Sequence, residues 1–266
     1  MKERLITGII GGILFISMVL IGGWIFTLFI VAVAFVAMIE LLKMRQIEPF
    51  SITGFISILS MLAFLLPKKW VDLVVPAHVT KVEILIGIIV ILLMITVLSK
   101  NSFTFDHVGF VILSSLYVGL GFHFLITARD VSEHGLLLVF FILILIWTTD
   151  SFAYFVGRKW GKYKLWPEIS PKKTIEGSIG GIVAAFLIGT LFYLFVPDIF
   201  KSYLSALLVI FIVSTFGQIG DLVQSALKRH YEVKDSGTIL PGHGGILDRF
   251  DSLIFVMPVL YLFHLI

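Results

Sequence analysis

The chain has 266 residues, of which 59% are hydrophobic and only 14% are charged, and its mean hydropathy is +1.08. This much apolar surface excludes a soluble protein and indicates an integral membrane protein. The sequence contains no cysteine, which excludes disulfides and thiolate-bound metals. The pI of about 9.0 does not indicate a nucleic-acid partner, because the basic residues stand beside apolar runs, where they commonly set membrane topology.

Continuous apolar runs predict an all-α, polytopic membrane protein with about nine spanning helices. A β-barrel would show short segments of alternating polarity instead. Taken as one membrane-embedded domain, residues 1–266 divide into a helical scaffold (1–135) and a half that carries the polar motifs (136–266). We place the spans at about 5–21, 24–43, 53–66, 82–98, 108–127, 136–156, 178–196, 203–222 and 246–265.

The distribution of basic residues predicts the orientation of the chain in the cell membrane. An odd number of spans puts the two termini on opposite sides. With the N-terminus in the cytoplasm, the cytoplasmic segments hold about fifteen of the 20 Lys and Arg residues. We therefore predict an N-in, C-out topology, with the long polar loops 157–177 and 223–245 and the active site facing the cytoplasm, where nucleoside triphosphates are found.

Few polar residues interrupt the first five predicted spans. Glu40 lies three residues before Lys43, and we expect it to pair with Lys43 or Arg45 at the membrane interface rather than to act in catalysis. His123 lies inside the fifth span. A single histidine there most often hydrogen-bonds a neighbouring helix, so we expect a structural role.

Asp150 is a carboxylate inside the sixth predicted span. An ionised carboxylate in a span is costly unless it is paired or solvated. It therefore indicates either an ion pair, with Arg158 or with a neighbouring helix, or a residue that faces a functional cavity. We favour the cavity.

A basic segment at 170–174 precedes the seventh span and contains Lys172, Lys173 and Thr174. We predict a loop entering a helix, with Glu176 in the first turn. Two lysines beside free backbone N–H groups suit a phosphate, whereas the alternative is an anchor at the cytoplasmic face with a helix cap. The next glycines are predicted to allow close helix packing rather than to bind a ligand: Gly177, Gly180 and Gly181.

The densest polar stretch runs from residue 221 to residue 251 between two apolar segments. Asp221 ends the eighth predicted span, and Asp248 and Asp251 begin the ninth. Residues three apart share a helix face, so two helix ends can bring three carboxylates together. Hard oxygen ligands suit Mg²⁺, which usually takes one or two carboxylates with water and substrate phosphates.

Basic residues and a glycine-rich bend accompany these acids. The glycines at 244 and 245 let backbone N–H groups approach an anion closely, at the start of the ninth span. His243 in the same bend either assists proton transfer or serves only as a hydrogen-bonding loop residue, and the sequence favours neither. Four bases neutralise the acids or hold pyrophosphate or a lipid phosphate: Lys228, Arg229, Lys234 and Arg249.

These motifs resemble the pattern of the CDP-diacylglycerol synthases, or phosphatidate cytidylyltransferases. The main match covers about 27 residues without a gap: Ser225-x-x-Lys228-Arg229, Lys234-Asp235-x-Gly237 and Leu240-Pro241-x-His243-Gly244-Gly245-x-x-Asp248-Arg249-Phe250-Asp251. Two upstream segments also resemble the family: Asp150-x-x-Ala153-Tyr154-x-x-Gly157-Arg158 and Ser170-Pro171-Lys172-Lys173-Thr174-x-Glu176-Gly177. The first five spans match only as generic membrane helices.

The resemblance implies that CTP and phosphatidic acid from the bilayer react to give CDP-diacylglycerol and pyrophosphate, with Mg²⁺ as cofactor. It assigns the metal to Asp221 and Asp248, with Asp251 as a further candidate. The predicted catalytic residues are Asp221, Asp248, Lys228, Arg229, Asp251 and His243. The predicted substrate contacts are Asp150, Lys172, Lys173, Thr174, Ser225, Lys234, Gly244, Gly245 and Arg249.

Two other functions use some of the same features. A lipid transporter or flippase also carries intramembrane acids, but here the charges gather at one face and the two halves lack corresponding broken helices. A non-catalytic scaffold for anionic lipids would use the basic loops and leave the acids without a role. Helix faces of small residues leave a homodimer open.

Overall fold

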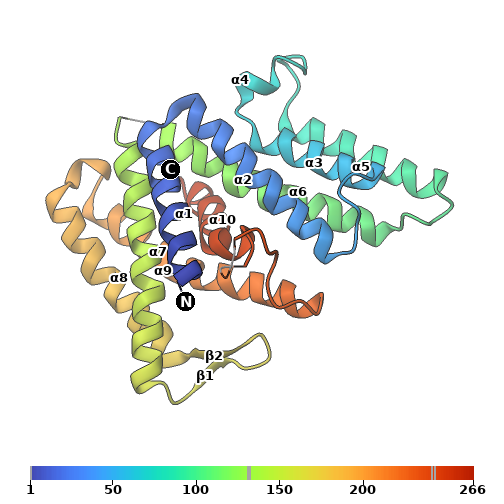
Figure 1. Ribbon diagram of the computed structural model, residues 1–266. Helices are drawn as coiled ribbons and strands as arrows, with labels where there is room; N and C mark the ends of the chain where they lie inside the picture. The colour runs from blue at the N-terminus through green and yellow to red at the C-terminus, as the bar shows by residue number, and fades with distance from the viewer. Residues whose placement is uncertain (1, 131–132, 241, 243) are drawn as a thin grey trace.

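The computed structural model describes residues 2–130, 133–240, 242 and 244–266, and within them the chain is almost entirely helical (Figure 1). One small hairpin, β1 (Lys164–Trp166) and β2 (Ser170–Thr174), interrupts the helices. The helices are α1 (Lys2–Ile21), α2 (Gly23–Met44), α3 (Ile52–Leu65), α4 (Lys68–Val71), α5 (Lys81–Leu98), α6 (Phe105–Asp130), α7 (Gly135–Trp160), α8 (Ile175–Phe195), the 3₁₀ helix η1 (Pro197–Ile199), α9 (Tyr203–His230) and α10 (Leu247–Leu262).

The all-α membrane class predicted from the sequence is confirmed. Among the described residues, six helices are long and apolar enough to cross a bilayer. They are α2, α5, α6, α7, α8 and α9. Shorter apolar helices cover Ile6–Ile21 and Ile52–Leu65, and α10 has only 16 residues. The count of about nine crossings therefore stays a prediction.

Local sequence signals explain where several of these helices begin. Ser51 and Thr80 each accept a hydrogen bond from a backbone N–H in the first turn of their helix, and Thr80 forms a full capping box with Glu83. Between α1 and α2, Gly22 and Gly23 have φ values of 67° and 59°, which only glycine adopts without strain, so the chain can reverse there.

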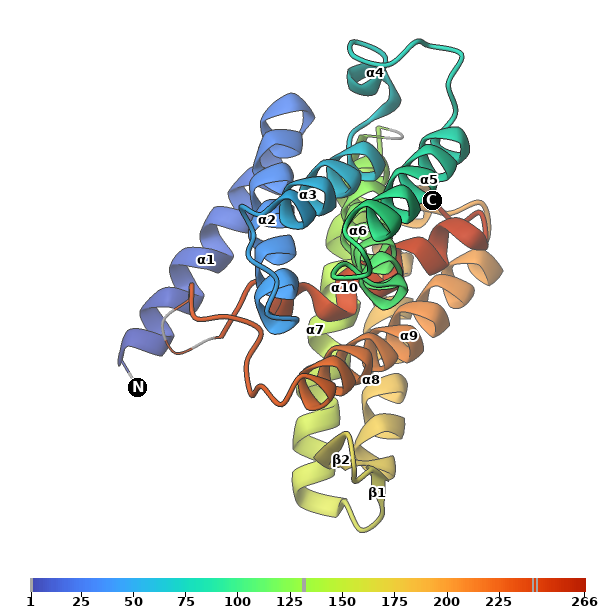
Figure 2. The ribbon, with the colours of Figure 1, turned by 90° about the vertical axis from the view of Figure 1, so that its right-hand side faces the viewer.

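The core lies where α10 packs against α9 and α6 (Figures 1 and 2). Phe250 at the start of α10 contacts Phe15 of α1 and Phe122 of α6, with ring centroids 5.2 and 5.5 Å apart. Near α3, His123 donates a hydrogen bond from Nδ1 to the Leu65 carbonyl, and its Nε2 accepts one from the Lys81 amine. Both contacts agree with its expected structural role. The N-terminal helices thus hold the start of α10 directly.

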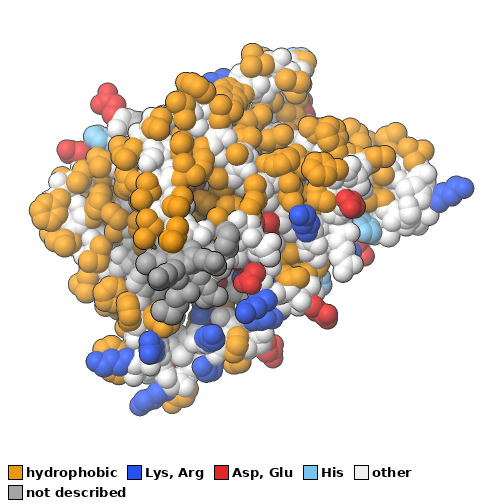
Figure 3. Space-filling view, viewed as in Figure 1, with side chains coloured by type: hydrophobic (Ala, Val, Ile, Leu, Met, Phe, Trp, Pro, Cys, Tyr) orange, Lys and Arg blue, Asp and Glu red, His pale blue; other side chains and the backbone are white. Residues whose placement is uncertain are grey.

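The hairpin lies at the same end of the molecule as the C-terminal end of α7 and the beginning of α8 (Figures 1 and 2). Hydrophobic side chains cover the visible faces of the helices, whereas Lys and Arg side chains gather around this end (Figure 3). Exposed basic residues there include Arg158, Lys159, Lys162 and Lys164. An apolar body with one charged end is the surface expected of a protein that meets water at that end.

Two predicted boundaries were wrong. The eighth span was expected to end at about residue 222, with Asp221 at its edge, but α9 continues to His230, so Asp221 lies inside a helix. The segment 170–174 was expected to be a loop, but it is strand β2, paired antiparallel with β1. In both cases the polarity that marks the edge of a span does not stop the regular structure.

Candidate functional site

A cavity of about 820 Å³ opens between the C-terminal half of α7, the β1–β2 hairpin, α9 and α10. Its lining is dominated by charge. Five carboxylates line it: Asp150, Asp221, Asp235, Asp248 and Asp251. Six bases line it as well: Arg158, Lys164, Lys172, Lys173, Lys228 and Arg249.

Small residues set the distance between α7 and α8 and so shape one wall of the cavity. A Cβ on Gly181 would lie 2.6 Å from the Thr149 carbonyl oxygen, and one on Gly177 would lie 2.6 Å from that of Ala153. The predicted close packing at these glycines is confirmed. Thr174 is buried beside them and caps α8 by accepting a hydrogen bond from the Gly177 N–H at 3.1 Å.

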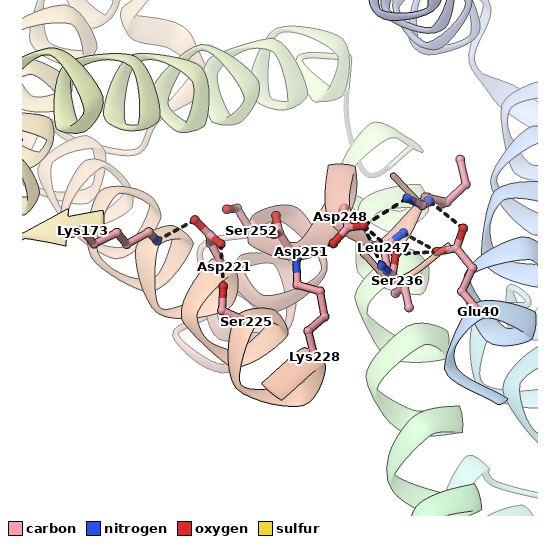
Figure 4. A network of polar contacts seen from close by, with 12 residues as sticks. Glu40, Lys173, Asp221, Ser225, Lys228, Ser236, Leu247, Asp248, Asp251 and Ser252 are labelled. Atoms are coloured by element: carbon pink, nitrogen blue, oxygen red, sulfur yellow. Dashed lines mark hydrogen bonds and ion pairs between the residues drawn. The ribbon is translucent and has the colours of Figure 1, made fainter. Parts of the chain in front are cut away.

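Asp221 faces the hairpin across the cavity (Figure 4). Its carboxylate forms an ion pair of 2.5 Å with Lys173 of β2, and the Ser225 hydroxyl donates to it at 3.4 Å. Asp221 and Ser225 therefore lie one turn apart on α9, and strand β2 supplies Lys173. Lys173 was predicted to bind phosphate, and the structure brings it to a carboxylate instead.

Asp248, in the first turn of α10, is the most constrained carboxylate of the cavity (Figure 4). Lys228 of α9 pairs with it at 2.6 Å, and the side chains of the pair are 17% and 6% exposed. Its other oxygen accepts hydrogen bonds from the Ser236 N–H and hydroxyl at 2.8 and 3.0 Å and from the Gly245 N–H at 3.0 Å. Four donors hold this side chain in one position.

Asp251 and Asp150 complete the acidic side of the cavity. Asp251 repels the carboxylates of Asp221 and Asp150 electrostatically, so these three acids act on one another. The ion pair between Asp150 and Arg158 that the sequence left open is not formed, since Arg158 donates to the Tyr154 hydroxyl at 3.3 Å. Asp150 instead faces the cavity, as the sequence favoured.

The interfacial pairing expected for Glu40 is wrong. Its carboxylate is buried, with only 4% of the residue exposed, and it accepts hydrogen bonds from Ser236, Ile246 and Leu247 at 2.9, 2.8 and 3.0 Å (Figure 4). No ion pair with Lys43 or Arg45 occurs in the described chain. The prediction failed because these partners lie about 200 residues away in sequence, whereas the two bases are neighbours.

The glycine-rich bend also differs from the expectation. Its backbone N–H groups were predicted to be offered to an anionic ligand, yet the Gly245 N–H donates to Asp248 and those of the next two residues donate to Glu40. The bend does bind anions, but they are carboxylates of the protein. Gly244, with a φ of 80°, leaves space for Asp248, because a Cβ there would lie 2.6 Å from its Oδ2 atom.

The other predicted site residues divide between the cavity and its surroundings. Predicted residues in the lining are Asp150, Lys172, Lys173, Thr174, Asp221, Lys228, Asp248, Arg249 and Asp251. Five more lie outside the lining: Ser225, Arg229, Lys234, Gly244 and Gly245. Arg229 contacts the hairpin by donating to the Ile169 carbonyl at 3.4 Å, and Lys234 is exposed. His243 lies outside the described residues.

A profile of the cytidylyltransferase family matches residues 2–266. The chain belongs to the cytidylyltransferase family. It is 50% identical to a phosphatidate cytidylyltransferase of Bacillus subtilis over 261 residues, which cover 98% of this chain and 96% of that protein. Proteins of the same description from Staphylococcus saprophyticus and Staphylococcus epidermidis are 47% and 45% identical, over 98% of this chain and 97% of each relative. The family and the enzyme class suggested by the motifs are confirmed.

Membership in the family makes the unpredicted lining residues relevant. Arg158 lies eight residues after Asp150 on α7 and Asp235 stands inside the main motif, so helical spacing and the motif offered a signal for each. Lys164 and Gln218 offered none. The first reaches the cavity only because the hairpin folds back. The second is an uncharged side chain inside a predicted span, where it donates to the Ser178 and Ser214 carbonyls.

The donor set of this cytidylyltransferase fits Mg²⁺ as a partial coordination shell. Asp221 and Asp248 place hard carboxylate oxygens in the same cavity, where each is paired with a lysine that a cation would have to replace. Among the described residues, no three Asp, Glu or His side chains form a metal cage. Mg²⁺ commonly takes one or two carboxylates and completes its shell with water and phosphate oxygens. The residues present therefore fit a cation that is shared with a phosphate substrate.

Proposed function

We propose that the chain is a phosphatidate cytidylyltransferase, which converts CTP and phosphatidate into CDP-diacylglycerol and pyrophosphate. The observation that carries this proposal is the cavity, where acids and bases line one space at the charged end of an apolar helical body. The names of the relatives from Bacillus and Staphylococcus support it at 45–50% identity. A water-soluble triphosphate and a membrane lipid require a site of this mixed kind.

The reaction joins two anions, so electrostatics is its main difficulty. A phosphate oxygen of phosphatidate attacks the α-phosphorus of CTP, the bond from that phosphorus to the bridging oxygen breaks, and pyrophosphate leaves with the electron pair. The lipid phosphate is already ionised and requires little base catalysis. Bound Mg²⁺ would supply Lewis-acid stabilisation of the leaving phosphates, with Asp221 and Asp248 as its protein ligands. Bases in the lining then lower the remaining repulsion.

Different parts of the cavity lining suit the two substrates. Lys172 and Arg158 lie at the hairpin side of the cavity and are exposed, which suits the triphosphate that arrives from water. Arg249 on α10 is exposed in the same cavity and is a further base that can contact the departing pyrophosphate. Tyr154 and Leu165 give the lining an apolar part, against which the glycerol backbone of the lipid can rest.

We also propose nine crossings, an N-in, C-out orientation and a site that opens to the cytoplasm. The gathering of bases around the hairpin supports this orientation, because positive charge is enriched on the cytoplasmic side of membrane proteins. Small-residue and exposed helix faces also leave room for a homodimer, in which α5 is a candidate contact because it is little buried within one chain.

The direct test uses the purified protein in detergent with labelled CTP, Mg²⁺ and phosphatidate. The proposal expects release of pyrophosphate and formation of a labelled lipid, both dependent on phosphatidate and both abolished by chelation of the metal. A transporter or a lipid-binding scaffold would bind lipid without releasing pyrophosphate. Turnover that continues at full rate in excess chelator would reject the assignment of the cation.

A further inference from the structure

The carboxylate of Glu40 connects the N-terminal half of the chain to the cavity. It projects from α2 and accepts three hydrogen bonds from the segment that begins at Ser236 and leads into α10 (Figure 4). The residue is 4% exposed, although a buried carboxylate is costly unless all its oxygens are bonded. Burial of this carboxylate is costly, and its hydrogen-bond partners lie about 200 residues away in sequence, so we infer that the contact has a specific role.

Two of the three donors belong to the beginning of α10. The first N–H groups of a helix lack partners within the helix, and Ile246, at the N-cap position, provides no side-chain cap of its own. Glu40 supplies this cap from another helix, by accepting from the N–H groups of Ile246 and Leu247. The partial positive charge at a helix start stabilises a carboxylate there, so charge and hydrogen bonding favour the same contact.

The surrounding backbone is fitted to this carboxylate. A Cβ on Gly237 would lie 2.6 Å from Glu40 Oε1, and a Cβ on Gly245 would overlap both the Ser236 hydroxyl and Glu40 Oε2. Two glycines of the motif therefore leave room for a side chain of α2. Their requirement is explained by the approach of Glu40, not by a substrate.

Ser236 extends the contact to the cavity. Its hydroxyl lies 2.9 Å from Glu40 Oε2 and 3.0 Å from Asp248 Oδ2, and its N–H donates to Asp248 at 2.8 Å. One hydroxyl has a single proton, so the two carboxylates share one donor. The position of Asp248 thus depends on the segment that Glu40 holds.

We propose that Glu40 is a positioning residue for the cytidylyl transfer, which fixes Ser236 and the start of α10 so that Asp248 is presented to the cation and the phosphates. This inference rests on the proposed function for its chemistry. The N-terminal helices then contribute to catalysis through one side chain, and loss of Glu40 loosens the segment rather than the fold.

Hydrogen exchange measured by mass spectrometry tests the contact without any turnover. In Glu40→Gln, one oxygen becomes an NH₂ group, which opposes a backbone or hydroxyl donor. We expect amide exchange in peptides covering residues 244–248 to become about tenfold faster or more, as for the loss of hydrogen bonds to a charged group. Peptides from α8 should be unchanged. The matched control is Glu48→Gln, an exposed glutamate just beyond the same helix, which should leave both regions unchanged.

Kinetics separates positioning from plain stability. A merely structural residue would lower the fraction of active protein and hence kcat alone. Positioning of Asp248 instead predicts that Glu40→Gln raises the Mg²⁺ concentration for half-maximal rate by about tenfold, with an unchanged KM for phosphatidate. Ser236→Ala keeps both backbone contacts of Glu40 and should raise the Mg²⁺ requirement without accelerating exchange at 246 and 247. The two effects on the Mg²⁺ requirement should be less than additive in the double variant.

The outcomes decide between the inference and the function on which it rests. Unchanged exchange at 244–248 in Glu40→Gln, or a fall in kcat with an unchanged Mg²⁺ requirement, overturns the positioning role. If Glu40→Gln does not fold, an unchanged Mg²⁺ requirement in Ser236→Ala overturns it by itself. Failure of the wild-type protein to release pyrophosphate rejects the proposed function instead, while the exchange measurement still reports on the contact.

Discussion

At the scale of single residues, the cavity contains both acids that form ion pairs and acids that do not. Asp221 and Asp248 each have a lysine partner, whereas Asp150 and Asp251 make no ion pair within the described chain. In the proposed reaction, incoming phosphates would compete for these lysines and leave the two carboxylates to the cation. Each pair links one acid to one base on a different element of the cavity wall.

Asp221→Asn tests the role of this carboxylate. The amide keeps the shape of the side chain but removes the charge that Lys173 and a cation require. We expect kcat to fall by at least about a hundredfold, the size typical for loss of an electrostatic contact to transferring groups. Steady-state release of pyrophosphate measures the effect. Asp198→Asn, an exposed aspartate in η1 away from the cavity, is the control and should retain wild-type rates.

Lys228→Gln tests the buried ion pair. Its partner Asp248 is 6% exposed at the side chain, so the variant leaves a buried carboxylate without its counter-charge. We expect a loss of about 3 kcal/mol in the free energy of unfolding, seen as a lower melting temperature in detergent. The exposed pair Lys68–Asp72 provides the comparison, and Lys68→Gln should cost under ~1 kcal/mol. Equal losses in the two variants would contradict the prediction.

The sequence could predict most of the acids and bases of the cavity, because they stand in a dense motif between apolar segments. It could not predict Glu40, since nothing near that residue in sequence indicates partners at 236, 246 and 247. It also could not predict that the Gly245 N–H would bind Asp248 instead of a substrate. Both are long-range or loop contacts, and these depend on how the helices assemble.

At the scale of elements, the cavity wall formed by α7 and α8 depends on glycines, which let the two helices pack closely. Glycines on α8 let its backbone approach α7, and the hairpin lies where α7 ends and α8 begins. Because α8 begins directly after β2, any change in the distance between the helices also moves Lys172 and Lys173. Helix packing and phosphate binding are therefore coupled at this corner.

Gly181→Ala tests this packing. The added Cβ would meet the Thr149 carbonyl at 2.6 Å, so the helices must separate, and we expect a loss of about 1–3 kcal/mol in stability. The matched substitution Gly87→Ala lies in α5, where nothing is within 4 Å of the new atom. It should be neutral or stabilise the helix by up to about 1 kcal/mol. Thermal unfolding of both variants measures the difference in sign.

The element boundaries show where sequence patterns stop being informative. Hydropathy placed the end of the eighth span at 222, because polar residues begin there. The helix nevertheless runs eight residues further, and Lys228 in this extension pairs with Asp248 of α10. Hydropathy reports the edge of the apolar layer, not the end of the hydrogen-bonded helix. The hairpin was missed because strands of three and five residues carry too little periodicity to recognise.

At the scale of the whole molecule, an apolar body carries one strongly charged end. The cavity lies at that end, and the helices of the first half support it through α10 (Figures 1 and 3). The sequence predicted the division into a scaffold and a polar half, but the structure joins them through Glu40 and Phe250. All residues that line the cavity come from the second half, and the first half contacts the segment that carries Asp248.

The proposed orientation can be tested because the chain has no cysteine of its own. Single cysteines replacing Lys69, in α4, and Lys162, just before the hairpin, react with a membrane-impermeant maleimide only from the side of the membrane that they face. We expect Lys69→Cys to react in intact cells and Lys162→Cys to react only after permeabilisation. Labelling of Lys162→Cys in intact cells would contradict the proposed orientation and indicate the opposite one.

The position of Asp150 along α7 has a consequence for the bilayer itself. It lies six residues before the end of the predicted span at residue 156, or about 9 Å along the axis. That depth is roughly a third of a hydrocarbon core. A lipid phosphate that reaches this carboxylate must therefore move below the level of the neighbouring headgroups, together with its acyl chains. Thinner membranes shorten that descent, so vesicles made of short-chain lipids should give the faster enzyme.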